Sequence, residues 1–439
     1  MLSSKNYGEN EPLHAPDRMI AVPFIYFTLL TIYLVRKHGG IDISAFMIMI
    51  YAFSAFCSIL LDVFGIYGMN GVCEKIPISP LATVCYCGLI TLAILPFSTI
   101  NSNGIQKIEL QKEWLVDVLS WVLIITFFTT LLSIFSNLEV VLHSDLKEVR
   151  DDVYENTEEV KLSGIQYLLA LPEALFSRFS PVAILFYYIN IAQKRKSTLF
   201  NWVLLLSSLT PVIKAVLIAG RTQPIYWFLA FFALYIFFRP MLDKEQRRQA
   251  LFPFAFFGTI VALFIAAVTI ARFTTIGISH DTGTFDSLLA YSGQSFINFN
   301  NFFCNYTFHS VHFDRILPLT NYFIMHPDWN LDDYRDMIWS YSGMNIGVFF
   351  TFLGDLLVDL GYMGMFIFVI LFSLLSTWVC KSANNEGTIM LSRLLIILVL
   401  LLMPLQGIFY YSYYKVNMGY YIVGSLIYCW MLSHTLKKA

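Results

Sequence analysis

The sequence predicts an all-α polytopic membrane protein, with about eleven transmembrane helices and a large helical extracytoplasmic cap loop. Hydrophobic residues make up 57% of the chain and charged residues only 13%, whereas a soluble domain carries about 25% charged residues. The mean hydropathy is +0.65, and apolar runs of about twenty residues, the length that crosses a hydrocarbon core, recur along the chain. A soluble chain of 439 residues could not bury this much apolar surface, so lipid must surround much of it.

The apolar runs fall into three groups separated by longer polar segments. Residues 1–135 contain four runs, residues 165–270 contain four more, and residues 361–439 contain three. The individual runs lie near residues 19–35, 44–66, 80–100, 115–135, 165–191, 199–218, 224–238, 250–270, 361–379, 391–408 and 418–435. We therefore expect an N-terminal, a central and a C-terminal membrane region, with boundaries good to a few residues.

Lysine and arginine residues in the short connections predict the orientation of the helices, because cytoplasmic loops carry an excess of both. Every second short connection is basic, and the connections between them are poor in basic residues. The basic side holds Arg36, Lys37, Lys107, Lys112, Lys194, Arg195, Lys196, Arg239, Lys244, Arg247, Arg248, Lys381, Arg393, Lys437 and Lys438. We expect this side to be the cytoplasm, which puts the N-terminus outside and the C-terminus inside.

Two segments are too long to be simple connections, and both fall on the predicted outer side. Residues 136–164 form an acidic extracytoplasmic loop, with seven Asp and Glu residues from Asp145 to Glu159. Residues 271–360 are long and rich in Tyr, Phe, Asn and Trp. Loops of that length are usually functional or disordered, and this aromatic content argues against disorder. We expect a folded extracytoplasmic cap there.

Within the cap, helices are expected around residues 285–310 and 329–340. The last part, residues 347–360, is apolar but is interrupted by Asp355 and Asp359. This pattern suits a re-entrant helix or a helix lying on the membrane surface better than a clean span.

Several classes of function have no support in the sequence. The net charge of -2 argues against a nucleic-acid partner. The chain contains no P-loop, no GxGxxG, no GxSxG and no HExxH motif, so nucleotide hydrolysis, dinucleotide chemistry and zinc proteolysis are not indicated. Its seven cysteines show no metal-binding spacing. We predict neither a cofactor nor a metal.

Ionisable groups inside apolar spans are costly, so each one requires a reason. Glu173 and Arg178 lie five residues apart in one run, where they either form a structural pair or contribute to a site. Arg221 occupies a tight hairpin before Pro224, which can start a helix. A guanidinium beside a helix N-terminus is suited to hold a phosphate. Arg272 is predicted to lie at the same depth. It either helps to bind a pyrophosphate from the other side or only extends its side chain to the membrane–water interface.

The cap carries a second group of candidates, His309, His312 and Arg315. Two histidines three residues apart share a helix face, but no third ligand stands at metal spacing. A sugar- or phosphate-contacting role and a structural role are therefore both open. Asp355, Asp359 and Arg335 are weaker candidates of the same kind.

The order of spans and connecting segments in this chain resembles that of a known family, the Wzy-type polymerases of O-antigen and other oligosaccharide repeat units in bacteria. The resemblance covers roughly residues 160 to 400 and depends on the order of several short motifs. In order, these are Gly220-Arg221-Thr222 between two spans, the basic connection 243–248, Ala271-Arg272-Phe273, Tyr291-Ser292-Gly293 with Asn298-Phe299-Asn300, and the segment 352–364. Some of these polymerases also carry Arg-x10-Gly in outer loops, a spacing shared by Arg272 and Gly283.

The resemblance implies a polymerising glycosyltransferase of the bacterial inner membrane, acting in lipopolysaccharide or other surface polysaccharide biosynthesis. Its substrates would be oligosaccharides linked to undecaprenyl pyrophosphate, and a chain-length regulator protein is a further possible partner. Arg178, Arg221, Arg272, His312 and Arg315 would then bind pyrophosphate or glycan. The general base that accepts the proton of the acceptor hydroxyl would be Glu173, His309 or Asp355.

Three other functions remain open. An O-antigen ligase would share the architecture and the donor but transfer the glycan to a lipid A core. A polytopic glycosyltransferase of another class would carry acidic residues in its first large outer loop, where residues 67–79 hold only Glu74. A transporter or flippase of lipid-linked glycans would carry charges along the centre of many spans, and only Glu173, Arg178 and Lys214 fit that pattern.

Overall fold

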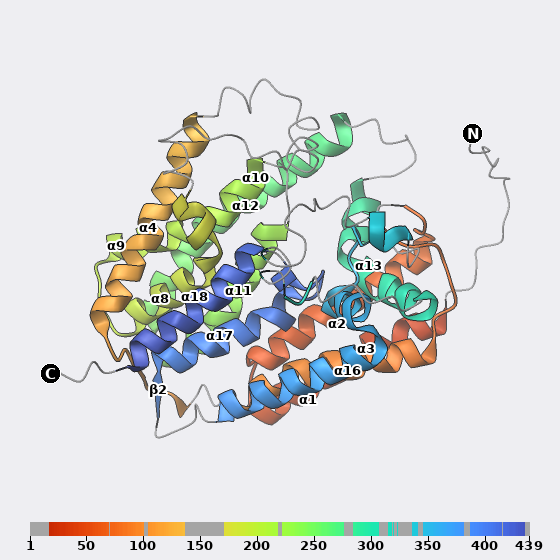
Figure 1. Cartoon of the computed structure of the whole chain (residues 1–439), viewed down its shortest axis with the longest axis horizontal. Coiled ribbons are helices and arrows are strands. Elements are labelled where there is room, and N and C mark those ends of the chain that lie inside the picture. The colour runs from red at the N-terminus through yellow and green to blue at the C-terminus, as the bar shows by residue number, and fades with distance from the viewer. Residues whose placement is uncertain are drawn as a thin grey trace.

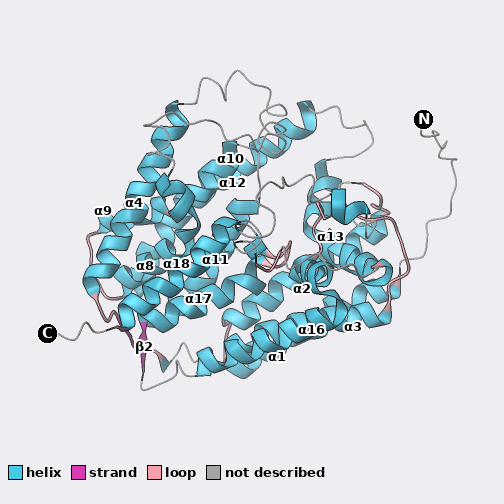
Figure 2. Cartoon of the chain, viewed as in Figure 1, coloured by secondary structure: helices cyan, strands magenta, loops and turns pink. Residues whose placement is uncertain are grey.

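The structure, a computed structural model, is built almost entirely from helices (Figures 1 and 2). It describes residues 17–69, 71–100, 104–136, 171–217, 222–275, 284–306, 315–317, 319, 323, 336–340, 346–381, 387–414 and 416–434. The predicted acidic loop lies outside these residues, apart from its first residue, Ser136. The helices form two groups that share one helix and also contact one another directly.

The first group packs α1, α2 and α3 with two helices from much later in the chain, α13 and α16. Their bounds are α1 Ala21–His38, α2 Ile43–Phe64, α3 Pro80–Ile94, α13 Thr284–Asn305 and α16 Thr351–Lys381. Side-chain caps fix where two of these helices begin. Asp42 accepts a hydrogen bond from Ala45 N at 2.8 Å, and Ser79 accepts one from Ala82 N at 3.4 Å. Such caps satisfy amide groups that the first helical turn leaves unpaired.

The second group contains the helices of the central region together with α4 and α18. Their bounds are α4 Glu113–Ser136, α8 Ser180–Ala192, α9 Thr198–Ser207, α10 Thr210–Leu217, α11 Thr222–Phe238, α12 Lys244–Thr275 and α18 Val416–Ser433. Helix α17, Leu391–Gln406, contacts α11 and α18 on one side and α3 and α16 on the other. It is therefore the helix that both groups share.

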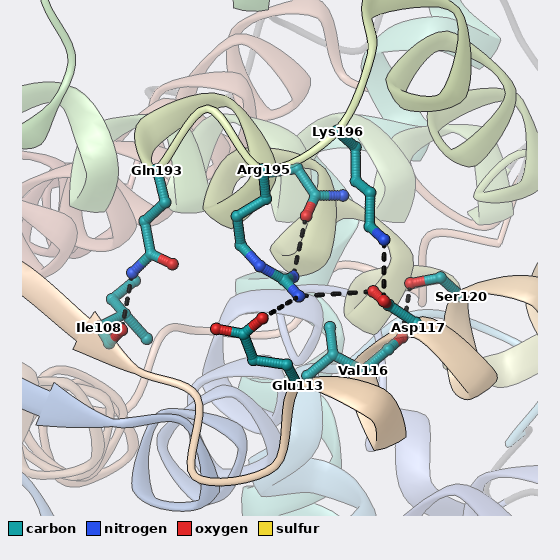
Figure 3. A network of polar contacts seen from close by, with 9 residues as sticks. Ile108, Glu113, Val116, Asp117, Ser120, Gln193, Arg195 and Lys196 are labelled. Atoms are coloured by element: carbon teal, nitrogen blue, oxygen red, sulfur yellow. Dashed lines mark hydrogen bonds and ion pairs between the residues drawn. The ribbon is translucent and has the colours of Figure 1, made fainter.

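Two short parallel strands mark one end of the molecule, which we call the strand end. Strand β1, Lys107–Glu109, pairs with β2, Thr388–Met390. Beside them the connection 193–197 is held by ion pairs, in which Arg195 and Lys196 contact the carboxylate of Asp117 at 3.4 and 2.8 Å (Figure 3). Lys194 reaches Asp243 at 3.8 Å, so the basic connections predicted to share a side do meet at this end.

The opposite end, which we call the loop end, is organised by the carboxylate of Asp62 at the end of α2. This buried group accepts hydrogen bonds from Lys75 Nζ at 2.6 Å, Tyr67 Oη at 2.6 Å and Asp17 N at 2.9 Å. Three donors compensate the cost of burying the charge. As a result, Asp62 fixes the connection between α2 and α3 against the start of the chain.

Helix α13 packs along α2 rather than standing apart as a separate layer. Its Gly293 lies so close to α2 that an added Cβ would be 2.6 Å from the carbonyl carbon of Cys57. The hydroxyls of Ser54 and Ser58 donate to the carbonyls of Ser292 and Gly293. Small residues that permit close backbone approach are typical of helix pairs inside membranes.

Helix α16 is divided by Gly361, whose φ of 68° and ψ of -176° are not helical. This backbone region is essentially restricted to glycine. The segment before the break, from Thr351 to Asp359, is buried, while Met363, Ile367 and Leu371 beyond it are exposed apolar side chains. The pattern that suggested a re-entrant or surface-lying helix thus corresponds to a short, buried helical segment.

Within the described residues, eight helices are long and apolar enough to cross a membrane. They are Arg18–His38, Ile43–Phe64, Pro80–Thr99, Glu113–Ile134, Leu171–Ala192, Thr198–Ala215, Thr222–Met241 and Thr351–Lys381. The other three predicted runs are helical as α12, α17 and α18, and α17 has only 16 residues. The prediction of a helical, multi-pass membrane protein is therefore confirmed, and the count of about eleven spans stays a prediction.

Replacement of Gly293 by Ala tests the contact between α2 and α13. The new methyl group would meet the α2 backbone, and we expect a loss of about 1–3 kcal/mol in stability, seen as a lower unfolding temperature of the purified protein. Gly88→Ala is the matched control, since nothing lies within 4 Å of an added Cβ on this α3 glycine. Equal unfolding temperatures for the two variants would contradict the close contact.

Candidate functional site

A pocket lies near the loop end, where α8, α10, α11 and the connection between α17 and α18 meet. Its lining consists of Arg178, Ser180, Pro181, Pro211, Gln223, Tyr226, Trp227, Ala230, Gln406, Tyr410, Ser412 and Met418. The cavity is narrow, with a volume of about 30 Å³, which is room for one or two water molecules. A sugar or pyrophosphate would bind at its mouth or after the lining side chains move.

The guanidinium of Arg178 is the charged group of the pocket. It belongs to the short 3-10 helix η4, Ser177–Phe179, which directly precedes α8. Gln223 and Gln406 add amide groups that can donate and accept hydrogen bonds. An arginine with neighbouring amides is suited to bind an oxyanion such as a phosphate.

Aromatic rings form much of the remaining wall. Trp227 is held in place because its Nε1 donates to Ser208 Oγ at 2.7 Å. The ring of Tyr226 lies 6.1 Å from those of both Phe409 and Tyr410. Ring faces of this kind provide flat apolar surfaces beside polar groups, a combination that suits the faces of a sugar ring.

Ser412 gives the pocket an unused polar group. Its side chain is buried, with a residue exposure of 4%, and within the described part of the chain its Oγ has no hydrogen-bond partner. A buried hydroxyl without a partner costs about 1–3 kcal/mol. A bound water or a ligand oxygen in the pocket would remove that cost.

Next to the pocket lies a buried ion pair between Arg315 and Asp355. The side chains are only 5% and 1% exposed, and Arg315 Nη2 contacts Asp355 Oδ1. The other carboxylate oxygen accepts a hydrogen bond from Tyr411 N. The guanidinium also lies over the ring of Phe350, 6.0 Å from its centroid. One turn along α16, Asp359 accepts a hydrogen bond from Ile316 N at 3.0 Å, so both carboxylates hold the same turn.

Non-helical backbone connects the ion pair to the pocket. Phe350 N and Thr351 N donate to the carbonyl of Phe409 at 3.1 and 2.9 Å, and Phe352 N donates to the carbonyl of Gly407 at 2.8 Å. Thr351 has a φ of 62°, a conformation that is costly for a β-branched residue. Strain of this kind often marks functional sites, and here Thr351 pairs with Tyr410, a residue of the pocket lining.

The structure brings only some of the predicted site residues together. Arg178 lines the pocket, and Arg315 and Asp355 form the neighbouring pair. Glu173 was expected either to pair with Arg178 or to contribute to a site, and its carboxylate holds Lys214 Nζ at 2.8 and 3.0 Å. That pair lies about one turn from Pro211 on α10, near the mouth of the pocket.

The remaining predicted residues cannot be compared with this arrangement. Arg221, His309, His312 and Arg335 lie outside the described residues. Arg272 lies within α12, and its side chain is also outside them. The predicted roles of these five residues stay predictions.

Sequence reasoning missed the uncharged part of the pocket. Trp227, Gln406, Tyr410 and Ser412 come from two separate stretches of the chain, and none of them is unusual in its local sequence. The one available signal was Gln406, a polar residue near the end of the apolar run 391–408 and close to Pro404. Across the described residues, no group of three or more His, Cys, Asp or Glu side chains is arranged to hold a metal ion.

Substitutions in the buried ion pair test how much it contributes to the free energy of unfolding. Arg315→Met leaves Asp355 buried without its partner, and we expect a loss of about 3–5 kcal/mol, whereas Arg315→Met with Asp355→Leu should regain much of it. Lys196→Met, at the partly exposed pair with Asp117, should cost at most about 1 kcal/mol. Chemical unfolding of the purified variants measures these differences. A double variant no more stable than Arg315→Met would contradict the pairing.

Comparison with known proteins identifies no relative of this chain. No family model matches it, and neither does any curated protein or any solved structure.

Proposed function

We propose that this protein polymerises oligosaccharide repeat units carried on undecaprenyl pyrophosphate. In the reaction, a hydroxyl oxygen of the acceptor unit attacks the anomeric carbon of the donor glycan. The bond between that carbon and the pyrophosphate oxygen breaks, undecaprenyl pyrophosphate leaves, and the hydroxyl proton passes to a base. The product is a longer glycan that remains on the acceptor's lipid.

The pocket around Arg178 is the observation that carries this proposal. Departure of a pyrophosphate develops negative charge, and a prepositioned guanidinium stabilises that charge where water is largely excluded. The aromatic walls formed by Tyr226, Trp227 and Tyr410 suit the glycan that leaves or joins. Together they meet the two chemical demands of the reaction, an anion at one point and sugar rings beside it.

Access for the lipid tail supports the same assignment. Leu171 and Leu175, two turns and one turn before Arg178, are 42% and 39% exposed. Since the helix that carries them is long and apolar enough to cross a membrane, these side chains suit contact with a hydrocarbon chain. A polyprenyl tail lying along them would bring its pyrophosphate toward Arg178.

The proposal assigns the strand end to the cytoplasm and the loop end to the outer face of the bacterial inner membrane. The basis is the gathering of basic connections at the strand end, because such residues are retained on the cytoplasmic side. Under this orientation the pocket faces the leaflet in which lipid-linked repeat units are polymerised, and the N-terminus lies outside.

The candidates for the base differ in their surroundings. The two oxygens of Asp355 face Arg315 and the amide of Tyr411, so we infer that Asp355 positions Arg315 rather than accepting a proton. Glu173 is 15% exposed and pairs with an exposed Lys214, and a substrate that displaces this lysine would free its carboxylate. His309 remains the other candidate.

Glycan ladders from cells that lack their own copy of the gene test the function. We expect Arg178→Gln to slow transfer about 100-fold, the cost of losing one donor to developing negative charge, so that long chains disappear while single capped units persist. Arg221→Ala and Arg272→Ala should do the same. Arg248→Gln, at the strand end, is the control and should leave the ladder unchanged.

Other outcomes would identify another function. Loss of single capped units as well as long chains would indicate a ligase or a flippase of lipid-linked glycans. A wild-type ladder from Arg178→Gln, at equal protein abundance, would show that this pocket does not bind the leaving group.

A further inference from the structure

A second cavity lies at the strand end, beside the last turn of α11, whereas the Arg178 pocket lies beside the first half of that helix. It is formed where three pairs of elements end or turn: α1 with α2, α3 with the 3-10 helix η2 (Leu95–Thr99), and α11 with α12. Its lining consists of His38, Gly39, Gly40, Ile41, Asp42, Ser98, Thr99, Ile100, Ile236, Arg239, Pro240 and Arg247. The cavity volume is about 440 Å³, which is large enough for a lipid head group.

Positive charge exceeds negative charge in this cavity. Arg247, on the first turns of α12, donates from Nη2 to the carbonyl of Arg239 at 3.0 Å. Its Nε is buried and, within the described part of the chain, has no hydrogen-bond partner. Arg239 itself is exposed. Both arginines therefore line the cavity, and the guanidinium of Arg247 keeps one donor without a partner among the described residues.

The single acidic residue of the lining does not neutralise these arginines. One oxygen of Asp42 caps α2 by accepting from Ala45 N at 2.8 Å. The other accepts from Ser44 Oγ at 3.2 Å and lies 2.7 Å from His38 Nδ1. With both oxygens engaged, Asp42 leaves Arg239 and Arg247 available to an anion.

The rest of the wall suits a molecule that is only partly polar. Ser98 and Thr99 donate their hydroxyl protons to the carbonyls of Leu95 and Pro96, so the arginines are the principal donors. Ile41, Ile100, Ile236 and Pro240 form an apolar side. Since the helices that end here are candidate membrane spans, the cavity lies at the level where a bilayer meets water.

We propose that this cavity binds a phosphate ester, with the phosphate between Arg239 and Arg247, and that its source is an anionic phospholipid of the adjacent leaflet. The apolar side would contact the glycerol and the first carbons of the acyl chains. Arginine pairs a phosphate bidentately, and each basic residue near a membrane surface strengthens binding of anionic lipid about fivefold. This site is independent of the glycan reaction proposed above.

Lipid binding to the purified protein tests the proposal. Native mass spectrometry of the detergent-solubilised chain, with added phosphatidylglycerol or phosphatidylcholine, should show retention of phosphatidylglycerol. We expect Arg239→Gln and Arg247→Gln to weaken it about fivefold each and the double variant about 25-fold. Arg248→Gln is the matched control, because Arg248 is exposed, adjacent in sequence and not part of the lining.

The remaining arms distinguish the source of the phosphate and the integrity of the variants. Glycerol 3-phosphate has no acyl chains, so it should compete only weakly with phosphatidylglycerol if the bound phosphate belongs to a lipid. If the protein binds this compound but does not retain phosphatidylglycerol, the ligand is a soluble phosphate ester, and the lipid source is overturned. The double variant Arg239→Lys with Arg247→Lys keeps the charge and should recover part of the retention. Equal retention of both lipids by the wild type, or full retention by the double Gln variant, would overturn the proposal.

Discussion

The carbonyl groups of Gly407 and Phe409 accept hydrogen bonds from three successive amides at the start of α16, those of Phe350, Thr351 and Phe352. In a protein surrounded by lipid, a non-helical segment at membrane depth is tolerated only where the protein itself satisfies its backbone groups. Here two such segments satisfy one another. Because of this junction, α16 begins and α17 ends inside the protein and not at its surface.

The buried charges depend on the same junction. Asp355 is covered because the segment after α17 folds back over the start of α16, and Tyr411 N then donates to it. Arg315 comes from a different part of the chain and completes the arrangement. A buried ion pair contributes little net stability compared with well-packed apolar residues. Its retention beside a strained Thr351 is consistent with a role in fixing the position of the neighbouring pocket.

Polar side chains of α13 supply a second set of specific contacts. Asn298 donates from Nδ2 to the carbonyls of Gly71 and Phe349 at 2.8 and 2.9 Å and accepts from Cys73 N. Asn300 accepts from Ser79 N at 2.9 Å. These contacts use polar side chains of α13, which is less apolar than α2 and α16. Through these hydrogen bonds, α13 links the segment between α2 and α3 to the start of α16.

The sequence was sufficient to predict the helices, because their apolar length and the basic connections are local properties. It also singled out Arg178 and Asp355 as charges in apolar stretches and Arg315 as part of a cluster with His309 and His312, while their roles stay predictions. It could not predict that Asp355 would meet Arg315 or that Glu173 would meet Lys214, 41 residues away. Such pairings depend on how helices that are distant in sequence pack. Tyr410 and Ser412 were missed because ordinary loop residues become distinctive only when a loop is buried.

The two strands have a mechanical consequence. The chain passes from the first helix group toward the second through β1, and it does so again through β2, and these two crossings are hydrogen-bonded side by side at the strand end. The paired strands therefore hold the two helix groups together at the strand end. The Arg178 pocket lies near the loop end, among helices of the second group and α17, so it can widen without disturbing this pairing.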